Sequence, residues 1–408
     1  LSTVKDDGIA DYTDESHRVP LHPISPDDGV GFELAGPRKT LFFDGPSIHA
    51  GIVTCGGLCP GLNNVIRALT NCLWRRYGVR QISGFQYGFQ GLVQPNFQKA
   101  IRLDPERVRH IHHLGGTILG SSRGPQDPKI MADSLVHAEI DLLFCLGGDG
   151  TMRGAQAIAH AAQPSSRPLA VVGLPKTIDN DIAFVERTFG FETAVSVAAE
   201  SIRAARVEAS GAPRCVGLVK LMGRHAGFVA ATAALVAREA DVVLVPEKPI
   251  NLSEVIKDVR TCLDSHGQAV VVVAEGAGQA LLTHDNKHDL SGNPRFGDIG
   301  RYLEVVLKEA FVDEVFNLKY IDPSYLVRAA PACSTDAMYC AQLAEHAVHA
   351  AMAGKTNLLI GLWCNRFTHV PLRVVNQYPK RIDLDGPLWR SVMDATHEPK
   401  GLHGSGHP

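Results

Sequence analysis

Short apolar runs alternate with longer amphipathic stretches along most of the chain, starting near residue 48. The amphipathic stretches, such as 63–75 and 190–208, have the period of helices. The apolar runs predict buried strands at 50–54, 141–146, 169–173, 216–220, 241–245 and 269–274. Buried strands separated by helices predict an α/β fold whose mostly parallel sheets are covered on both faces. Ligands of such folds bind at the carboxyl ends of the strands.

The N-terminal residues depart from this pattern. Residues 1–45 carry many acidic and few basic side chains, with prolines interleaved, and show no helical or strand period. We expect an extended arm there, ordered only where it packs on a neighbour. Residues 381–408 are expected to form a C-terminal tail.

Composition and charge exclude several classes of protein. The 408 residues suffice for two or three domains, and 45% hydrophobic with 20% charged residues is typical of a soluble globular protein. The formal net charge of −3 gives no reason to expect nucleic acid or an anionic membrane as a partner. The longest apolar run is far shorter than the roughly 18–20 residues of a membrane span.

The cysteines and the first residues suggest a location. The nine cysteines are scattered without the spacing of a zinc site, and the first residues lack a basic stretch followed by an apolar core. The histidines show no ligand spacing either, so we expect them to be structural. We therefore expect a cytoplasmic protein with reduced thiols.

Two glycine-rich loops follow predicted strands. In Gly56–Gly61 (GGLCPG), glycines let backbone N–H groups approach an anion at a helix N-terminus, although a tight turn alone would also require them. The loop is neither a P-loop nor a dinucleotide fingerprint. In Gly147–Thr151 (GGDGT), Asp149 can hold a magnesium ion that bridges phosphate oxygens. The simpler interpretation is that Asp149 caps a helix in a tight turn.

A third loop, Pro175–Asp181 (PKTIDND), places two carboxylates two residues apart beside an amide and a cation. One carboxylate can bind a metal while the other accepts a proton, provided that their surroundings separate their pKa values. Asp149 and Asp179 are thirty residues apart in the same predicted sheet, which favours a functional site over an ordinary solvated loop.

Three later segments carry charges where strands are predicted to end. They are Met222-Gly223-Arg224, Ala274-Glu275-Gly276 and the stretch 319–328 (KYIDPSYLVR). Cations suit a substrate phosphate and carboxylates suit sugar hydroxyls. Each segment taken alone would more often be a structural ion pair.

Together these motifs resemble the phosphofructokinase family, from about Ile52 to Arg373. The matching motifs are GGLCPGLNNVIR, GGTILGSSRGP, GGDGT, PKTIDND, KLMGRHAGF, VPE, AEGAGQ and KYIDPSYLVR. The LGSSRG and KYIDPSYLVR forms are more similar to plant and trypanosomatid enzymes than to the short enterobacterial type. The resemblance implies two Rossmann-like three-layer domains with the active site in the cleft between them. It also implies phosphoryl transfer to the 1-hydroxyl of fructose 6-phosphate in glycolysis.

The resemblance also implies how the chain is divided. Residues 46–190 with about 332–380 would form the phosphoryl-donor-binding domain, and 191–331 the sugar-phosphate-binding domain. The family's tetrameric and allosteric habit suggests a homo-oligomer, a tetramer or a dimer, with shared active sites. The resemblance gives no reason to assume the allosteric ligands of the short enzymes for this chain.

Functional residues follow position by position from the resemblance. The donor site would be lined by Gly57, Arg123, Gly124, Gly148, Asp149, Gly150 and Thr151. Asp149 with Asp181 would position Mg²⁺, and Asp179 would be the base. The other catalytic residues would be Thr177, Lys176 and Arg224. The sugar phosphate would be bound by Thr177, Ile178, Asp179, Met222, Gly223, Arg224, Glu275, Lys319, Tyr325 and Arg328. Lys319 matches a cation that the family donates from a neighbouring subunit.

Several positions depart from the short bacterial pattern. Cys215 occupies the place of an arginine, with Arg214 one residue away, so the second cross-subunit contact is in question. Tyr325 stands where the short enzymes have histidine. Phe89 replaces a tyrosine that is often found near the adenine.

The phosphoryl donor remains open between ATP and pyrophosphate. Pyrophosphate users of the family usually carry Asp at the position of Gly150 and Lys at the position of Lys176, so this chain is mixed. Gly150 leaves room for the α-phosphate and nucleoside, whereas an Asp would collide with them and repel them, which favours ATP. NAD kinases and lipid kinases share GGDGT but lack the other motifs. A catalytically inactive scaffold would be expected to have lost Asp149 or Asp179.

Overall fold

The computed structural model describes residues 2–3, 12–21, 30–163, 165, 167–282 and 295–396. These residues divide into two units, which we describe separately. Unit 1 contains the described residues up to Thr193 and those from Arg328 to Lys380, and unit 2 contains the remainder. The sequence prediction put the corresponding boundaries at 190 and 332.

In the described part of unit 1, the main sheet has nine strands. In spatial order they are β2 (Arg18–Pro20), β3 (Gly31–Leu34), β15 (Arg366–Pro371), β14 (Leu358–Trp363), β9 (Ala170–Pro175), β8 (Leu142–Gly147), β5 (His49–Thr54), β6 (Gln81–Phe85) and β7 (Ile101–Arg102). The strands from β14 to β6 run parallel, and antiparallel strands extend both edges. A separate antiparallel pair joins β1 (Ser2–Thr3) to β4 (Thr40–Leu41).

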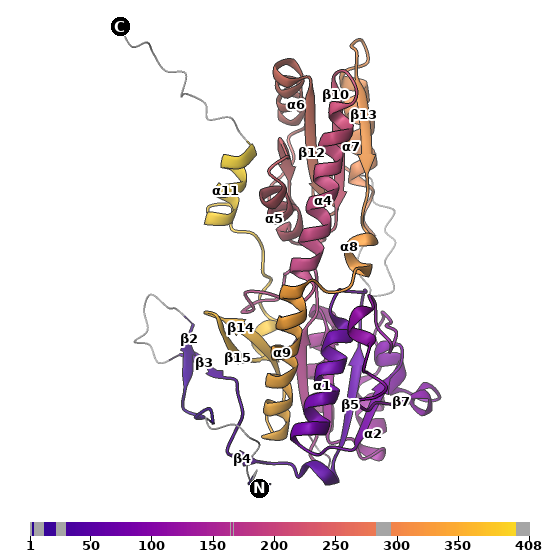
Figure 1. The fold of residues 1–408 in the computed structure, drawn as a ribbon, viewed down its shortest axis with the longest axis vertical. Helices are drawn as coiled ribbons and strands as arrows, with labels where there is room; N and C mark the ends of the chain where they lie inside the picture. Colours follow the sequence, from indigo (N-terminus) through magenta and orange to yellow (C-terminus); the bar gives the residue numbers. More distant parts are fainter. Residues whose placement is uncertain are drawn as a thin grey trace. The chain divides into compact units, whose positions relative to one another are not determined.

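Helices cover both faces of this sheet. On one face, α1 (Leu62–Arg76) lies beside α9 (Ser334–Met352) (Figure 1). On the other, α2 (Pro128–His137) and α3 (Asp149–Ala162) pack on Leu143 and Cys145 of β8, with the short α10 (Leu372–Val375) against α3. Helix α1 illustrates the local cause, because Val65, Ile66, Leu69 and Leu73 recur at helical spacing and are fully buried.

The described part of unit 2 has a parallel four-stranded sheet. The order is β11 (Val242–Leu244), β12 (Gln268–Ala274), β10 (Cys215–Leu221) and β13 (Asn317–Ile321). Helices α6 (Leu252–His266) and α7 (Ile299–Ala310) cover one face around Val216, Leu218, Val271 and Val273. The other helices are α5 (Phe228–Ala237), α11 (Pro387–Thr396) and two that cross between the units along the chain, α4 (Phe191–Ser210) and α8 (Leu326–Ala329).

The α/β fold class is confirmed. Each predicted strand exists with ends shifted by no more than two residues, for example 169–173 against Ala170–Pro175. Two terminal segments differ from the expectation. In the expected arm, β2 and β3 join the main sheet, and Phe32 packs edge-on against Phe184 and Trp363. In the expected tail, α11 buries Trp389 and Val392 in unit 2.

Candidate functional site

The loop after β5 is shaped by glycines with positive φ. Gly56 has φ +84°, and Gly61 has φ +94° at the N-cap of α1, conformations that L side chains rarely adopt. The backbone N–H of Gly56 donates to Ser122 O at 3.0 Å, and the Ser121 hydroxyl donates to Gly56 O at 2.6 Å. The 56–61 loop is thereby tied to the loop that carries Arg123.

Three cations surround Gly57. The Nζ of Lys176, a residue only 5% exposed, donates to Gly57 O. A β-carbon on Gly57 would lie 3.2 Å from Arg123 Nη2 and 3.4 Å from Arg328 Nη1. Burial lowers the pKa of Lys176, and the charges of Arg123 and Arg328 lower it further. Clustered positive charge around backbone amides attracts an anion.

The GGDGT motif forms the turn from β8 into α3. Gly148 is the N-cap and Asp149 is the first helical residue, so the motif lies at the positive end of the helix dipole. Gly147 has to be glycine, because a β-carbon there would lie 2.0 Å from Thr151 Oγ1. A β-carbon on Gly150 would instead meet only Arg153 Nη2, at 3.8 Å. Position 150 therefore has free space.

A pocket of about 370 Å³ joins these loops within unit 1. Its lining includes Gly56, Arg123, Gly124, Gly150 and Thr151. Phe89 also lines the pocket, and its ring contacts the backbone at Gly154, where a β-carbon would lie 2.4 Å away. Most of the residues predicted for the donor site are therefore neighbours around one cavity that combines small residues, a cation and an aromatic ring.

The PKTIDND loop is held by its own polar groups. The Thr177 hydroxyl accepts a hydrogen bond from Asp179 N at 3.0 Å. Buried Asn180 has φ +53°, and its side chain accepts from Thr188 N at 3.0 Å and donates to Glu186 O at 3.2 Å. The Thr188 hydroxyl donates to Thr177 O at 2.7 Å. These bonds fix the backbone on both sides of Asp179.

Asp149 and Asp181 line a second, smaller pocket in unit 1. The Asp149 carboxylate, about half exposed, forms an ion pair with Arg153 one helical turn later. Among the described residues, no cluster of three or more His, Cys, Asp or Glu could hold a metal by itself. Two carboxylates nevertheless suit Mg²⁺, which is commonly held by one or two carboxylates together with substrate phosphates.

In unit 2, the loops after β10 and β12 are joined. Gly223 has φ +133°, and its carbonyl accepts from Gly276 N at 3.0 Å, while Glu275 N donates to Leu221 O at 2.8 Å. A β-carbon on Gly276 would lie 1.9 Å from Arg224 O, so only glycine permits this approach. The predicted sugar-phosphate residues Met222, Gly223, Arg224 and Glu275 are therefore close neighbours.

The remaining predicted residues are more dispersed. Lys319 is exposed in the edge strand β13, paired in register with Gly217, and Tyr325 is 77% exposed. Arg328 belongs to unit 1 and lies near Gly57. Ile178, also in unit 1, is buried. Arg214 forms ion pairs with Asp264 and Glu314 at 2.8 and 3.0 Å, and Cys215 is fully buried.

Sequence reasoning missed two residues near these sites. Arg153 lines the pocket of Gly150 and pairs with Asp149; the i, i+4 spacing of opposite charges in GGDGTMR could have revealed it. The ring of Phe296 lies 4.4 Å from the Arg224 guanidinium. No local pattern connects these two residues, which are 72 positions apart.

Comparison with known proteins identifies the family. The family model described as Phosphofructokinase matches residues 49–351. The ATP-dependent 6-phosphofructokinase of Amycolatopsis methanolica is 45% identical, over 93% of this chain and 85% of its own. The enzymes of the same name from Trypanosoma cruzi and Arabidopsis thaliana (number 7) are 43% and 41% identical, over 95% and 96% of this chain and 83% and 82% of their own.

Solved structures share the fold. The pyrophosphate-dependent phosphofructokinase of Marinobacter aquaeolei superposes with a TM-score of 0.71 at 22% identity, covering 83% of this chain and 86% of its own. The phosphofructokinase of Pichia pastoris gives a TM-score of 0.67 at 24% identity, covering 81% of this chain and 35% of its own. The chain belongs to the phosphofructokinase family, and the resemblance seen in its motifs is confirmed. Among the described residues, no helix combines the length and apolar character of a membrane span.

Proposed function

We propose that the chain is a glycolytic enzyme that transfers the γ-phosphoryl group of ATP to the 1-hydroxyl of fructose 6-phosphate, giving fructose 1,6-bisphosphate and ADP. The observation that carries the proposal is the pocket in unit 1 where Gly150 and Thr151 meet Arg123 and Gly124. Relatives that are 41–45% identical over almost the whole chain and are named for this ATP-dependent activity support it.

The free space at Gly150 favours ATP over pyrophosphate. A nucleotide extends beyond its β-phosphate, and the pocket beside Gly150 continues to Phe89, which offers an apolar surface. One observation favours the alternative, a pyrophosphate-dependent phosphotransferase: the chain has Lys176 at a position where pyrophosphate users of the family usually carry lysine. Its bond to Gly57 O gives Lys176 a role with either donor, because it holds the loop that approaches the phosphates.

The PKTIDND loop supplies the chemistry in this proposal. Asp179 accepts the proton of the sugar hydroxyl, and Thr177 contacts the transferring phosphoryl group. Lys176 with Arg224 stabilises negative charge on that group. Asp149 and Asp181 would hold Mg²⁺, which supplies charge neutralisation between donor phosphates when it is bound.

The sugar phosphate is assigned to Met222, Gly223, Arg224, Glu275, Lys319, Tyr325 and Arg328. The close contact of the Arg224 and Glu275 loops supports a shared role for those two residues. Lys319 is exposed and acts on a neighbouring subunit in this proposal, so the enzyme is a homo-oligomer, a tetramer or a dimer. We assign it to the cytoplasm, in keeping with its scattered cysteines. Arg214 is already paired with two carboxylates, so we assign it no cross-subunit role.

A coupled assay with fructose 6-phosphate tests the proposal. We expect turnover with MgATP and at least tenfold lower kcat/KM with pyrophosphate, which is about 1.4 kcal/mol of discrimination. A preference for pyrophosphate would establish the alternative. No turnover with either donor, in protein shown to be folded, would favour an inactive scaffold.

A further inference from the structure

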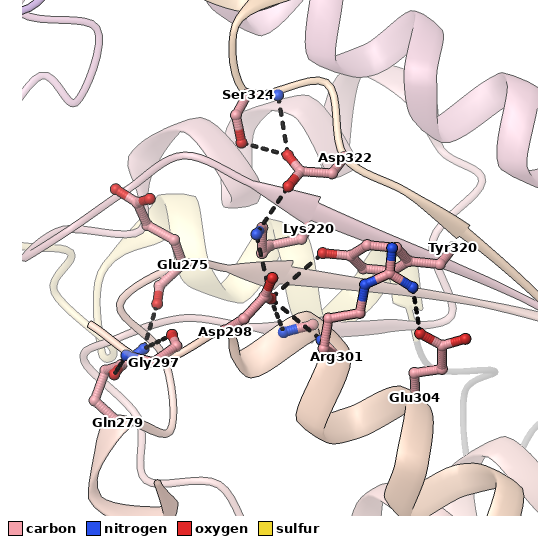
Figure 2. A network of polar contacts seen from close by, with 11 residues as sticks. Lys220, Glu275, Gln279, Gly297, Asp298, Arg301, Glu304, Tyr320, Asp322 and Ser324 are labelled. Carbon is pink, nitrogen blue, oxygen red and sulfur yellow. Dashed lines mark hydrogen bonds and ion pairs between the residues drawn. The ribbon is translucent and has the colours of Figure 1, made fainter. Parts of the chain in front are cut away.

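Lys220 lies two residues before Met222, and the proposed function gives it no role. Its side chain is only 13% exposed and contacts two carboxylates (Figure 2). The distances from Nζ are 2.8 Å to Asp322 Oδ2 and 3.2 Å to Asp298 Oδ1. Although burial disfavours the charged amine, the hydrogen bonds to Asp322 and Asp298 raise the pKa of Lys220. The amine therefore stays protonated in the folded protein.

One carboxylate shapes the segment that carries Tyr325. Asp322 accepts hydrogen bonds from the backbone N–H of Ser324 at 3.1 Å and from the Ser324 hydroxyl. The following turn is closed by Leu326 N, which donates to Pro323 O at 2.8 Å. Tyr325 lies inside this turn, so the backbone that presents it to solvent is anchored through Asp322 to Lys220.

The other carboxylate fixes the start of α7. Asp298 is the N-cap and accepts from Gly300 N at 3.1 Å and Arg301 N at 3.2 Å. Phe296, two residues earlier, places its ring against the Arg224 guanidinium. The position of the Arg224 side chain therefore depends on where Asp298 holds the chain.

Glu275 is connected to the same carboxylate through Gln279. The Gln279 side chain accepts from Gly297 N at 3.1 Å and donates to Gly297 O at 3.1 Å and to Glu275 O at 2.7 Å (Figure 2). Gly297 immediately precedes Asp298. The segments carrying Arg224, Glu275 and Tyr325 thus converge on two carboxylates that share one partly buried amine.

We propose that Lys220 is a positioning residue for sugar-phosphate binding, because it neutralises and joins Asp298 and Asp322, which hold the Arg224, Glu275 and Tyr325 segments in place. The inference rests on the proposed function, which assigns those three residues to the sugar phosphate. Without the amine, the two carboxylates would repel each other and move apart, and the binding side chains would move with them.

The chain offers a matched control on α7. Lys308 Nζ lies 2.8 Å from Glu304, but the Lys308 side chain is 57% exposed and pairs within one helix. Lys308→Met removes an ion pair of the same type, while Glu304 keeps its second partner, Arg301 Nη1 at 2.7 Å, and Lys220 keeps both of its carboxylates. We therefore expect it to leave both KM values and kcat unchanged.

The test is steady-state kinetics of the full-length enzyme with each substrate varied. We expect Lys220→Met to raise the fructose 6-phosphate KM about tenfold or more, the scale of a displaced binding group, with the ATP KM and kcat within about threefold of wild type. Lys220→Arg, which retains the charge, should recover most of this loss. An unchanged sugar-phosphate KM in folded Lys220→Met, or equal losses for both substrates without rescue by arginine, would overturn the inference.

Asp322→Asn keeps the test decisive if Lys220→Met does not fold. The asparagine oxygen can still accept from Ser324, so the variant removes the charge and keeps the turn. We expect a selective rise of about threefold or more in the fructose 6-phosphate KM; no rise would contradict the inference. Wild-type activity is measured first, because a wild type without turnover refutes the proposed function, whereas an active wild type with unaffected variants refutes only the role of Lys220.

Discussion

A β-carbon added at Gly150 would meet only the flexible end of Arg153, and this glycine has an ordinary helical conformation at the start of α3. Substitutions there should change the contents of the pocket without straining the backbone. Gly147, three residues earlier, contrasts with it, since any side chain there would collide with Thr151. Two glycines of one motif thus serve different purposes, one for the turn and one for the space beside the donor.

The donor argument predicts the effect of Gly150→Asp. At an effective dielectric near 20, a carboxylate within about 4 Å of the α-phosphate is repelled by about 4 kcal/mol. The kcat/KM for ATP should fall about a hundredfold or more, and residual activity should shift toward pyrophosphate, which has no α-phosphate. In Gly150→Asn, whose side chain is equal in size but neutral, the kcat/KM for ATP should fall less. A donor ratio that is the same in wild type and Gly150→Asp would refute the role of this position.

The assignment of the base predicts the effect of Asp179→Asn. The backbone bond from residue 179 to the Thr177 hydroxyl remains possible, so the loop should persist while the proton acceptor is lost. We expect kcat to fall by roughly 10²–10⁴, with much less effect on the sugar-phosphate KM. Asp133→Asn on α2, where the carboxylate is exposed, serves as control and should retain full turnover. A wild-type rate for Asp179→Asn would place the base elsewhere.

At the scale of elements, α9 and β15 hold histidines in the interior of unit 1. His346 stacks on Phe367 with ring centroids 4.5 Å apart, and its Nδ1 has no hydrogen-bond partner among the described residues. Burial lowers the pKa of His346 to about 4, with a smaller contribution from His369. The unfolded chain therefore takes up this proton first as the pH falls below about 6.5, so folding stability decreases between pH 6.5 and pH 4.

The histidine geometry predicts the behaviour of His346→Phe. An aromatic ring can keep the stacking on Phe367, while the titrating group is removed. The variant should match wild type above pH 7 and be more stable near pH 4, by up to about 3 kcal/mol. Urea unfolding at a series of pH values measures this difference. The same substitution at exposed His137 should have no effect, and equal acid sensitivity of wild type and His346→Phe would contradict the assignment.

The elements also show which features could be predicted from the sequence. Buried strands such as β5 and β8 were found because each is a continuous apolar run between helices. Strands β2 and β3 were missed because they have only three and four residues, too few to display a period. The glycine-rich loops predicted the donor pocket. Contacts such as that of Lys220 with Asp322 depend on the register of neighbouring strands, which the local sequence pattern does not encode.

At the scale of the whole molecule, the proposed function requires more than one copy of the chain. Lys319 is exposed on the edge strand β13, and its place in the family pattern corresponds to a residue donated to a neighbour. Asp179 and Lys319 would then serve one reaction from different subunits. Replacing Asp179 alone, or Lys319 alone, in all subunits would therefore inactivate every site of a homo-oligomer.

Mixing two inactive variants tests the shared site. Asp179→Ala and Lys319→Ala subunits, refolded together, should regain activity, because some sites combine an intact Asp179 with an intact Lys319. An equal random mixture should restore about a quarter of the sites, if each site draws these two residues from two independent subunits. Activity is measured on the unseparated mixture, and affinity tags verify that hetero-oligomers have formed. Verified hetero-oligomers without any recovery would refute the exchange of Lys319 between subunits.

The open space beside Gly150 has an evolutionary consequence. A glycine codon that ends in a pyrimidine becomes an aspartate codon through one transition at its middle base. Because a β-carbon at this position would meet only the flexible end of Arg153, we expect the mutant protein to fold, so that selection can act on its activity. Lineages of this family could therefore exchange nucleotide for inorganic donor, and back again, without passing through a misfolded ancestor.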